Sequence, residues 1–157
     1  SGNIGATNVL RTGKKTLGIS TLVLDSLKAY FAVTITLNFF PEYIYLSALL
    51  CFLGHIFPIW LKFNGGKGIA AYLGILFAYS VNLGFIFLIT WSIILFFSKY
   101  SSLSSILSSL VIFLFLITLD NFYMSLFFFI VFIIILYTHK ENISRIKEKA
   151  ENKINFL

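Results

Sequence analysis

Three stretches of the chain combine glycines, hydroxyl or amide side chains and basic residues, the groups that bind phosphate and other anions in proteins. The first runs from Ser1 to Arg11 and reads SGNIGATNVLR. Gly2 and Gly5 allow backbone N–H groups to turn toward an anion, and Arg11 can hold a phosphate through two parallel hydrogen bonds. Further side-chain donors are Ser1, Asn3, Thr7 and Asn8. The alternative is an ordinary polar turn in which one of these side chains caps the next helix.

The second stretch, Gly54 to Gly68, ends in Gly65-Gly66-Lys67-Gly68 directly before an apolar run. A glycine-rich turn that leads into a helix N-terminus presents unpaired amides and a partial positive charge, which suit a phosphate, and Lys67 adds a full charge. The stretch lacks the nucleotide-binding pattern GxxxxGK[ST], because Leu61 and Gly68 occupy two of its fixed positions. A nucleoside triphosphatase is therefore disfavoured. The alternative is a flexible turn between helices.

The third stretch, His139 to Arg145, begins where the last apolar run ends. At helical spacing, His139 and Asn142 share a face with Arg145 or Ser144 one turn further on. This face could line a polar site. The alternative is a basic anchor at a helix end, which explains Arg145 well and Asn142 poorly.

Two further features lie inside apolar runs. His55 is near the end of one run, where an unpaired imidazole would be costly, so a packing or hydrogen-bonding role is its alternative to catalysis. Asp25 and Lys28 are three residues apart and predict an intramembrane ion pair on one side of a helix. We expect this pair to be mainly structural, with substrate contact by Lys28 as the alternative.

The composition is that of an integral membrane protein. Hydrophobic residues make up 59% of the chain, charged residues 11%, and the mean hydropathy is +0.93, whereas soluble domains have roughly 25% charged residues. The single cysteine, Cys51, can form neither an internal disulfide nor a thiolate cluster. The aromatic-rich composition indicates lipid-facing and interhelical packing rather than a metal or redox site.

The apolar runs predict an all-α, polytopic membrane helix bundle. They are Leu17–Phe40, Tyr43–Phe63, Ile69–Ser80, Leu83–Ser98, Leu103–Leu119 and Phe122–Thr138. If Ile69 to Ser98 forms two helices, the chain crosses six times and eleven of its twelve basic residues fall on one side. The positive-inside rule then puts both ends of this chain in the cytoplasm. The third helix is short and is expected to be tilted or incompletely spanning.

No repeat, linker or second domain interrupts the sequence, so residues 1–157 are interpreted as a single domain. The segment Lys140 to Leu157 alternates Lys and Glu with apolar residues, which predicts a helix that leaves the membrane along its surface. A solvated tail is the alternative for the part beyond Arg145. The three polar stretches are expected to meet at one face of the bilayer.

Together the stretches resemble the signature motifs of the bacterial acyl-phosphate-dependent glycerol-3-phosphate acyltransferases, the PlsY family. The resemblance covers the whole chain, with Asp25 and Lys28 between the first two motifs. The matching residues are Ser1 to Asn8 with Arg11, Gly54-His55 with Phe57-Pro58 and Gly65 to Gly68, and His139 with Glu141 to Ile143 and Arg145. Four positions depart from the family's pattern. Asn64 stands where the family often has a basic residue, and Lys140 stands where Arg is usual. Ala71 stands where Thr is usual, and Lys149 where Gly is common. Family members have one more helix before the first motif, which implies that this chain lacks it.

The resemblance implies transfer of a fatty acyl group from acyl phosphate to the 1-hydroxyl of glycerol 3-phosphate, giving 1-acylglycerol 3-phosphate and phosphate. Arg11 and Lys67 would bind phosphate, the amides of Gly65 to Gly68 would cradle the donor phosphate, and Asn142 would orient the reactants. Ser1, Asn3 and Thr7 would be further orienting donors. Either His55 or His139 could take the hydroxyl proton, because an imidazole titrates near neutrality. A non-bridging oxygen of the donor phosphate is the alternative base.

The same resemblance implies no cofactor, no metal and no nucleic acid, because an acyl phosphate is already an activated mixed anhydride. Its partners would be the two substrates, membrane lipids and an enzyme that makes acyl phosphate. The location would be the bacterial inner membrane, with the active site facing the cytoplasm.

Two rival functions remain at this stage. A small anion transporter would need polar groups through the depth of the bundle, whereas the outward half is almost purely Phe, Ile and Leu. A purely structural subunit leaves the three motifs unexplained. An acyltransferase with a His followed by four residues and an Asp is disfavoured, because His55 leads to Trp60 and His139 to Ser144.

Overall fold

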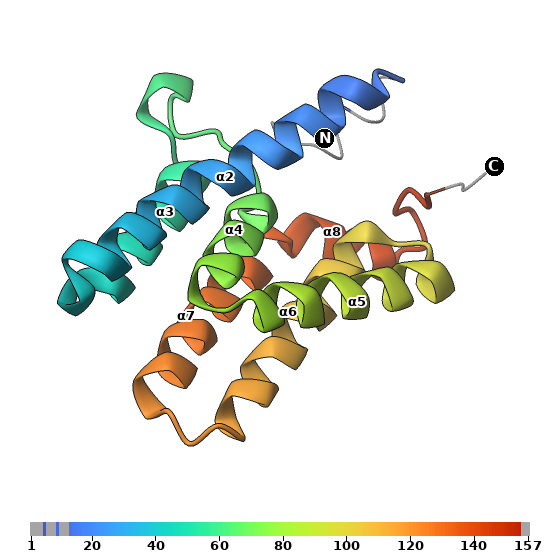
Figure 1. The fold of residues 1–157 in the computed structure, drawn as a ribbon. Helices are drawn as coiled ribbons and strands as arrows, with labels where there is room; N and C mark the ends of the chain where they lie inside the picture. Colours follow the sequence, from blue (N-terminus) through green and yellow to red (C-terminus); the bar gives the residue numbers. More distant parts are fainter. Residues whose placement is uncertain (1–4, 6–8, 10–12, 155–157) are drawn as a thin grey trace. The chain divides into compact units, whose positions relative to one another are not determined.

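The computed structural model describes residues 5, 9 and 13–154, and its described regular elements are all helical. This confirms the all-α prediction. The main helices are α2 (Lys15–Phe39), α3 (Ile44–Ile56), α4 (Ile69–Tyr79), α5 (Val81–Ser98), α6 (Ser101–Ile117), α7 (Phe122–Thr138) and α8 (Lys140–Lys147), shown in Figure 1. Two short 3₁₀ helices, η1 (Pro41–Tyr43) and η2 (Ile59–Leu61), flank α3. The first motif, from Ser1 to Arg11, lies outside the described residues except for Gly5 and Val9.

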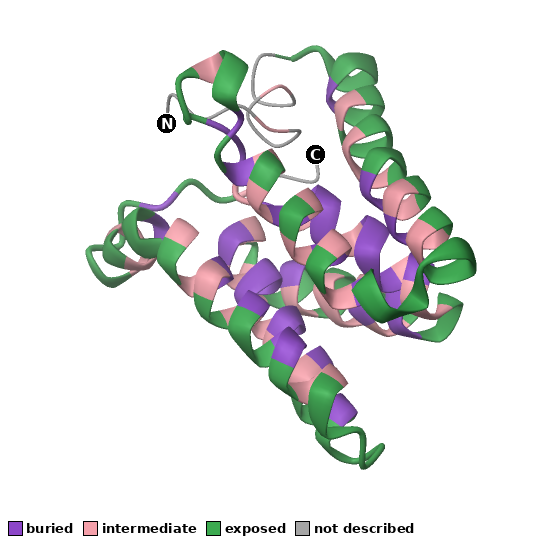
Figure 2. Ribbon diagram, turned by 90° about the vertical axis from the view of Figure 1, so that its left-hand side faces the viewer, coloured by how far each residue is buried: buried purple, intermediate pink, exposed green. Residues whose placement is uncertain are grey.

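Within the described part of the chain, three helical segments are long and apolar enough to cross a bilayer. They are Lys15–Phe39, Pro41–Leu61 and Val81–Ser98, and α7 with α8 would make a fourth if the pair, bent by 58°, is taken as one span. Their outward side chains are large and apolar: Phe31 is 56% exposed and Phe97 is 79% exposed. Figure 2 shows how buried and exposed residues are distributed along the helices. Exposed apolar side chains on helices of this length suit contact with lipid tails.

The chain divides into two compact units, Ser1–Gly84 and Phe85–Leu157. In the first unit, α2 packs along α4 and beside α3. The two helices α2 and α4 approach each other closely at Gly74, where an added Cβ would lie 2.0 Å from the Ser26 carbonyl oxygen. Ala70, Gly74 and Ala78 recur every four residues on α4, a small-residue pattern that lets two membrane helices approach closely.

The segment from Ile69 to Ser98 forms two helices, as the charge distribution predicted. The break is at Ser80, whose extended backbone (φ −164°, ψ 131°) ends α4 before α5 begins at Val81. With 11 residues, α4 is about 16 Å long. It therefore covers about half of a ~30 Å hydrocarbon core, consistent with the predicted short helix.

In the second unit, α6 and α7 pack against each other, joined by a short loop around Asp120. Five serines on α6 are buried: Ser102, Ser104, Ser105, Ser108 and Ser109. The hydroxyls of Ser104 and Ser105 donate to carbonyls one turn back in their own helix. The indole N–H of Trp91 on α5 donates to Ser105 Oγ at 3.1 Å. Ser104 and Ser105 thus satisfy their polarity within α6, and the row of serines gives this helix a small contact surface.

The C-terminal segment differs from the predicted surface helix. Helix α8 has only eight residues, and Lys149 follows it with a left-handed backbone (φ 56°). The amides of Ala150 and Glu151 both donate to the Arg145 carbonyl, which turns the chain back. Further on, the Ile154 amide donates to the Lys99 carbonyl at 2.9 Å. The tail therefore packs on its own unit up to Ile154.

Candidate active site

The glycine turn between α3 and α4 is held against the end of α3. The Gly65 amide donates to the Ile56 carbonyl at 3.0 Å, and the Gly66 amide donates to the His55 carbonyl at 3.2 Å. An added Cβ at Gly65 would lie 2.2 Å from the His55 carbonyl oxygen, so this approach requires glycine. The phosphate cradle predicted for the amides of Gly65 to Gly68 stays a prediction; in this structure the Gly65 and Gly66 amides donate to carbonyls that the end of a helix leaves unpaired.

The remaining part of the turn leads into α4. Gly68 has a left-handed backbone (φ 89°), and an added Cβ would lie 2.4 Å from the ring of Phe52. Its carbonyl accepts the Tyr72 amide at 2.8 Å, which starts the helix. Lys67 thus stands directly before the N-terminus of α4, where the first-turn amides have no intrahelical acceptor. A substrate phosphate would meet both the helix dipole and the Lys67 charge there.

The predicted ion pair between Asp25 and Lys28 is confirmed, and His55 joins it. Lys28 Nζ lies 2.6 Å from Asp25 Oδ1 and 3.0 Å from His55 Nδ1. The distance between His55 Nδ1 and Asp25 Oδ1 is 3.5 Å. The side chain of His55 is 8% exposed, so its polar ring is satisfied by α2 rather than by solvent. This supports the hydrogen-bonding interpretation of His55.

His139 lies at the bend between α7 and α8 and is 3% exposed. Its Nδ1 is 2.9 Å from the Ile135 carbonyl oxygen. A carbonyl only accepts, so Nδ1 carries a proton, and in the neutral form of the ring the lone pair would be on Nε2. That is the tautomer a general base needs.

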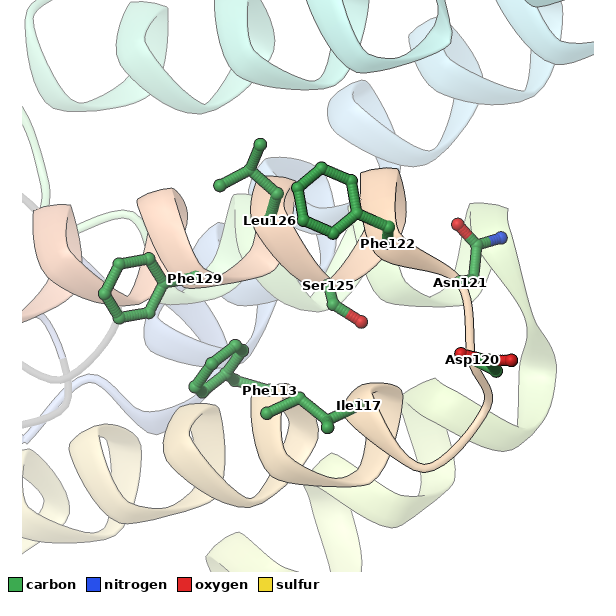
Figure 3. A pocket seen from close by; sticks show the side chains of 8 residues that line it. All are labelled: Phe113, Ile117, Asp120, Asn121, Phe122, Ser125, Leu126 and Phe129. Carbon is green, nitrogen blue, oxygen red and sulfur yellow. The ribbon is translucent and has the colours of Figure 1, made fainter.

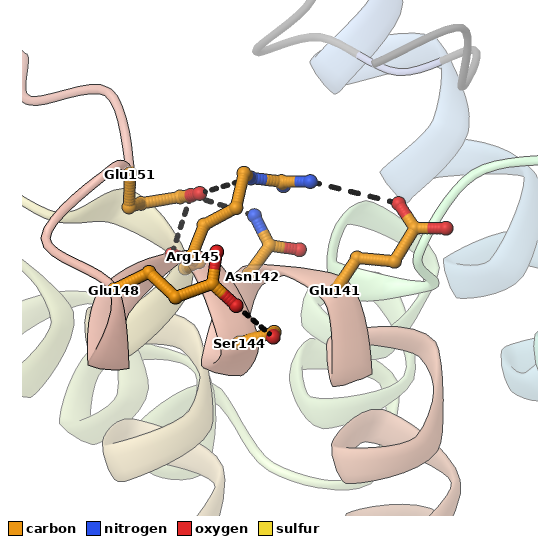
Figure 4. Close-up of polar contacts among 7 residues, drawn as sticks. Glu141, Asn142, Ser144, Arg145, Glu148 and Glu151 are labelled. Carbon is orange, nitrogen blue, oxygen red and sulfur yellow. Dashed lines mark hydrogen bonds and ion pairs between the residues drawn. The ribbon is translucent and has the colours of Figure 1, made fainter.

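Asn142 and Arg145 meet on one carboxylate, that of Glu151, as Figure 4 shows. Glu151 Oε1 accepts from Asn142 Nδ2 at 2.6 Å and from the Ser102 hydroxyl at 2.9 Å, while Oε2 accepts from Arg145 Nε at 2.7 Å. Arg145 Nη1 also lies 3.6 Å from Glu141 Oε2. Asn142 and Arg145 therefore lie on one face of α8, as predicted from their spacing. Ser144 points elsewhere, and its hydroxyl donates to Glu148 Oε1.

The electrostatics of Glu151 follow from these partners. Burial alone would raise the pKa of its carboxyl, but hydrogen bonds from Arg145, Asn142 and Ser102 outweigh burial and leave the pKa below its usual value. The same bond to Glu151 raises the pKa of the Arg145 guanidinium. Sequence reasoning did not identify Glu151 or Ser102 as site residues, because a Glu in a Lys/Glu-rich tail has the pattern of a solvated residue.

A cavity of about 380 Å³ lies elsewhere in the second unit, between α6 and α7 near their loop, as Figure 3 shows. Its lining is largely apolar and includes Phe113, Phe122 and Phe129, with Asp120 and Asn121 at the loop. None of the predicted site residues lines it. It lies at the start of α7, whereas His139 follows the end of that 17-residue helix. The cavity is thus no part of the candidate active site.

The structure therefore groups the described motif residues into two sets. The first unit joins Lys28 to His55, whose carbonyl accepts from the glycine turn, and the second places His139 directly before α8 and Asn142 and Arg145 within it. Among the residues that the structure describes, no group of three or more His, Cys, Asp or Glu side chains is placed to hold a metal ion. The predictions for Ser1, Gly2, Asn3, Thr7, Asn8 and Arg11 fall outside the described residues.

Helical segments that are long and apolar enough to span a bilayer indicate an integral membrane protein. A family model described as glycerol-3-phosphate acyltransferase matches residues 1–149. A glycerol-3-phosphate acyltransferase of Pelagibacter ubique is 54% identical over 153 residues, which cover 98% of this chain and 80% of the relative. A glycerol-3-phosphate acyltransferase of Mesorhizobium japonicum is 44% identical over 154 residues, which cover 98% of this chain and 79% of that relative. The chain belongs to the glycerol-3-phosphate acyltransferase family and is an integral membrane enzyme.

Solved structures agree. The glycerol 3-phosphate form of PlsY, an integral membrane glycerol 3-phosphate acyltransferase, matches with a TM-score of 0.93 and 33% identity, covering 99% of this chain and 80% of that one. The lysophosphatidic acid form of PlsY matches with a TM-score of 0.91 and 32% identity. This match covers 98% of this chain and 81% of that one. The resemblance read from the motifs is confirmed at the level of the family and its acyltransferase activity.

Proposed function

We propose that this enzyme transfers a fatty acyl group from acyl phosphate to the 1-hydroxyl of glycerol 3-phosphate. The observation that carries the proposal is the match over residues 1–149 to the acyltransferase family, with relatives solved in glycerol 3-phosphate and lysophosphatidic acid forms. The hydroxyl oxygen attacks the acyl carbonyl carbon, and the bond between that carbon and the phosphate oxygen breaks. The products are 1-acylglycerol 3-phosphate and inorganic phosphate.

The chemistry required of the protein is positioning, because the donor is already activated. Two anions must be held together, their repulsion relieved and the developing oxyanion stabilised. We assign phosphate binding to Lys67 with the first-turn amides of α4, and to Arg11. Ser1, Asn3 and Thr7 are assigned as orienting donors. Asn142 orients the reactants, and its amide nitrogen is fixed by Glu151 at 2.6 Å.

The hydroxyl proton has two proposed acceptors. One is Nε2 of His139, the ring atom that carries the lone pair of the neutral imidazole when Nδ1 donates to the Ile135 carbonyl. A non-bridging phosphate oxygen of the donor is the second. A His139→Ala variant that keeps near-normal kcat would select the substrate-assisted route.

We further propose that residues 1–157 act as one domain in the bacterial inner membrane, crossing it six times with both ends and the active site on the cytoplasmic side. Eleven basic residues on one side of this topology support the proposal. Substrate supply would come from an enzyme that makes acyl phosphate, and the acyl tail would reach the site from membrane lipid.

The test is product formation by purified protein in lipid nanodiscs. We expect phosphate release from palmitoyl phosphate that depends on glycerol 3-phosphate, with 1-palmitoylglycerol 3-phosphate formed in equal amount. Lys67→Met should raise KM for at least one substrate by about tenfold, the effect of losing one charged hydrogen bond. Transfer from an acyl thioester but not from acyl phosphate would contradict the proposed donor.

A further inference from the structure

Both ends of the turn that carries Lys67 are attached to the same turn of α2. Before the glycine turn, the His55 ring meets Lys28 at 3.0 Å and Asp25 at 3.5 Å. After it, the Ser26 hydroxyl donates to the Ala70 carbonyl in the first turn of α4, at 2.9 Å. The three α2 side chains lie within four consecutive residues. One short piece of a membrane helix therefore holds the end of α3 and the start of α4.

The attachment at His55 reaches the glycine turn through the backbone. The His55 carbonyl accepts the Gly66 amide, and the next carbonyl, that of Ile56, accepts the Gly65 amide. A Cβ added at Gly65 would lie 2.2 Å and 2.6 Å from these same carbonyl oxygens, so the turn lies close against them. A shift of the His55 ring would therefore move the acceptors on which the turn rests.

The atoms of the cluster also define the state of His55. An ammonium group can only donate, so His55 Nδ1 accepts from Lys28 and the neutral ring carries its proton on Nε2. Asp25 accepts the second bond from Lys28 and balances its charge. The ring lone pair is thus already used, in contrast to His139, whose Nδ1 faces a carbonyl. His55 is poorly suited to take a proton from a substrate.

We propose that Asp25, Lys28 and His55 form a positioning cluster that, together with Ser26, sets the conformation of the glycine turn and hence the place of Lys67. His55 acts through its hydrogen bond to Lys28 and its carbonyl, and it is not the general base. The catalytic consequence rests on the proposed function, in which Lys67 binds a substrate phosphate. The structural consequence, an ordered turn, does not.

The first experiment compares His55→Asn with His55→Ala in the acyl-phosphate assay. Asparagine places an acceptor oxygen near the position of Nδ1 and can accept from Lys28, but it cannot serve as a base. We expect His55→Asn to keep kcat close to wild type, and His55→Ala to raise KM for a phosphate-bearing substrate by about tenfold or more. A loss in kcat of about a hundredfold or more in His55→Asn, with KM unchanged, would instead make His55 the base and overturn the proposal.

The second experiment measures hydrogen exchange at the Gly65 and Gly66 amides in nanodiscs and needs no activity. We expect exchange to be about tenfold faster or more in Asp25→Asn and Lys28→Met. Thr21→Ala is the matched control, since the Thr21 hydroxyl bonds only back to Leu17 in α2, and it should leave exchange unchanged. Unchanged exchange in both cluster variants would overturn the proposal. Faster exchange in a protein that does not use acyl phosphate would uphold the cluster and refute the proposed donor.

Discussion

The carboxylate of Glu151 is the meeting point of three side chains from α6 and α8, and its own side chain is only 3% exposed. Its oxygens accept from a guanidinium, an amide and a hydroxyl, so all three donors depend on one residue. Removing an acceptor from buried donors costs more than the bond itself contributed, because the donors lose water as well. Glu151 therefore fixes both the C-terminal tail and the orientation of Asn142.

We predict that Glu151→Gln lowers the apparent Tm at pH 7, because it removes the negative charge facing Arg145. The loss should be about 1–3 kcal/mol, or a few degrees. The folded-state pKa of Glu151 is below its unfolded-state value, so its contribution is present above about pH 4.3, the ordinary value for Glu. It is lost as the pH falls further, through the folded-state pKa. Thermal unfolding of both proteins from pH 7 to pH 3 should show the Tm difference shrinking at the acid end, and a constant difference would contradict this.

A substitution of Lys149 should change the thermal stability in the opposite direction, toward a higher Tm. The Lys149 φ of 56° is in the left-handed region, which costs a residue with a Cβ about 1–2 kcal/mol and glycine almost nothing. The structure thus explains why the motif family favours Gly at this position. We expect Lys149→Gly to raise the apparent Tm by one or two degrees, part of the gain being offset by the greater freedom of glycine in the unfolded chain. Ser144→Gly, inside α8 (Lys140–Lys147), is the control and should lower it.

The residue contacts show what spacing can and cannot predict. Asp25 and Lys28 were predicted as a pair because residues three apart in a helix are neighbours. The contact of Lys28 with His55 bridges 27 positions, and that of Ser102 with Glu151 bridges 49. Such contacts depend on how helices pack, which a periodic pattern within one segment does not encode.

At the scale of elements, α4 is the helix on which the candidate site depends, because its N-terminus follows Lys67 and its small residues set its distance from α2. The apolar run predicted its bounds to within one residue. The preceding run, predicted as Tyr43–Phe63, is divided in the structure, since α3 ends at Ile56 and η2 follows Pro58. Hydropathy does not detect this break because the residues around Pro58 are as apolar as the helix.

We predict that Gly74→Ala destabilises the protein through the α2–α4 contact. The new Cβ would lie 2.0 Å from the Ser26 carbonyl oxygen, so the two helices must separate. Overpacking of this kind costs about 1–3 kcal/mol. Gly54→Ala is a matched control, because its Cβ would meet nothing within 4 Å and alanine favours a helix over glycine. Thermal unfolding in detergent should show a lower Tm for Gly74→Ala only, and equal values would contradict the close approach.

For the whole molecule, composition and the motifs were sufficient to predict a helical membrane acyltransferase, because a bilayer admits few architectures for so apolar a chain. The number of crossings is less directly encoded. Helices of 11 and 17 residues, α4 and α6, are shorter than the usual span. Charge distribution is what favours six crossings, since it places Lys99 and Lys140 on the same side as Lys15.

This topology makes a prediction for the whole chain that a labelling experiment can check. In a Cys51→Ser background, which has no other cysteine, single cysteines are introduced at Asp120, Lys99 and Lys140. In spheroplasts, a membrane-impermeant maleimide should label Asp120→Cys, because the proposed topology puts the α6–α7 loop on the outer side. It should label Lys99→Cys and Lys140→Cys only after the membrane is permeabilised. Acyl-transfer activity of each variant provides the control for correct insertion. Labelling of Lys140→Cys in intact spheroplasts would place the stretch with His139 and Asn142 on the outer face, where cytoplasmic substrates could not reach it.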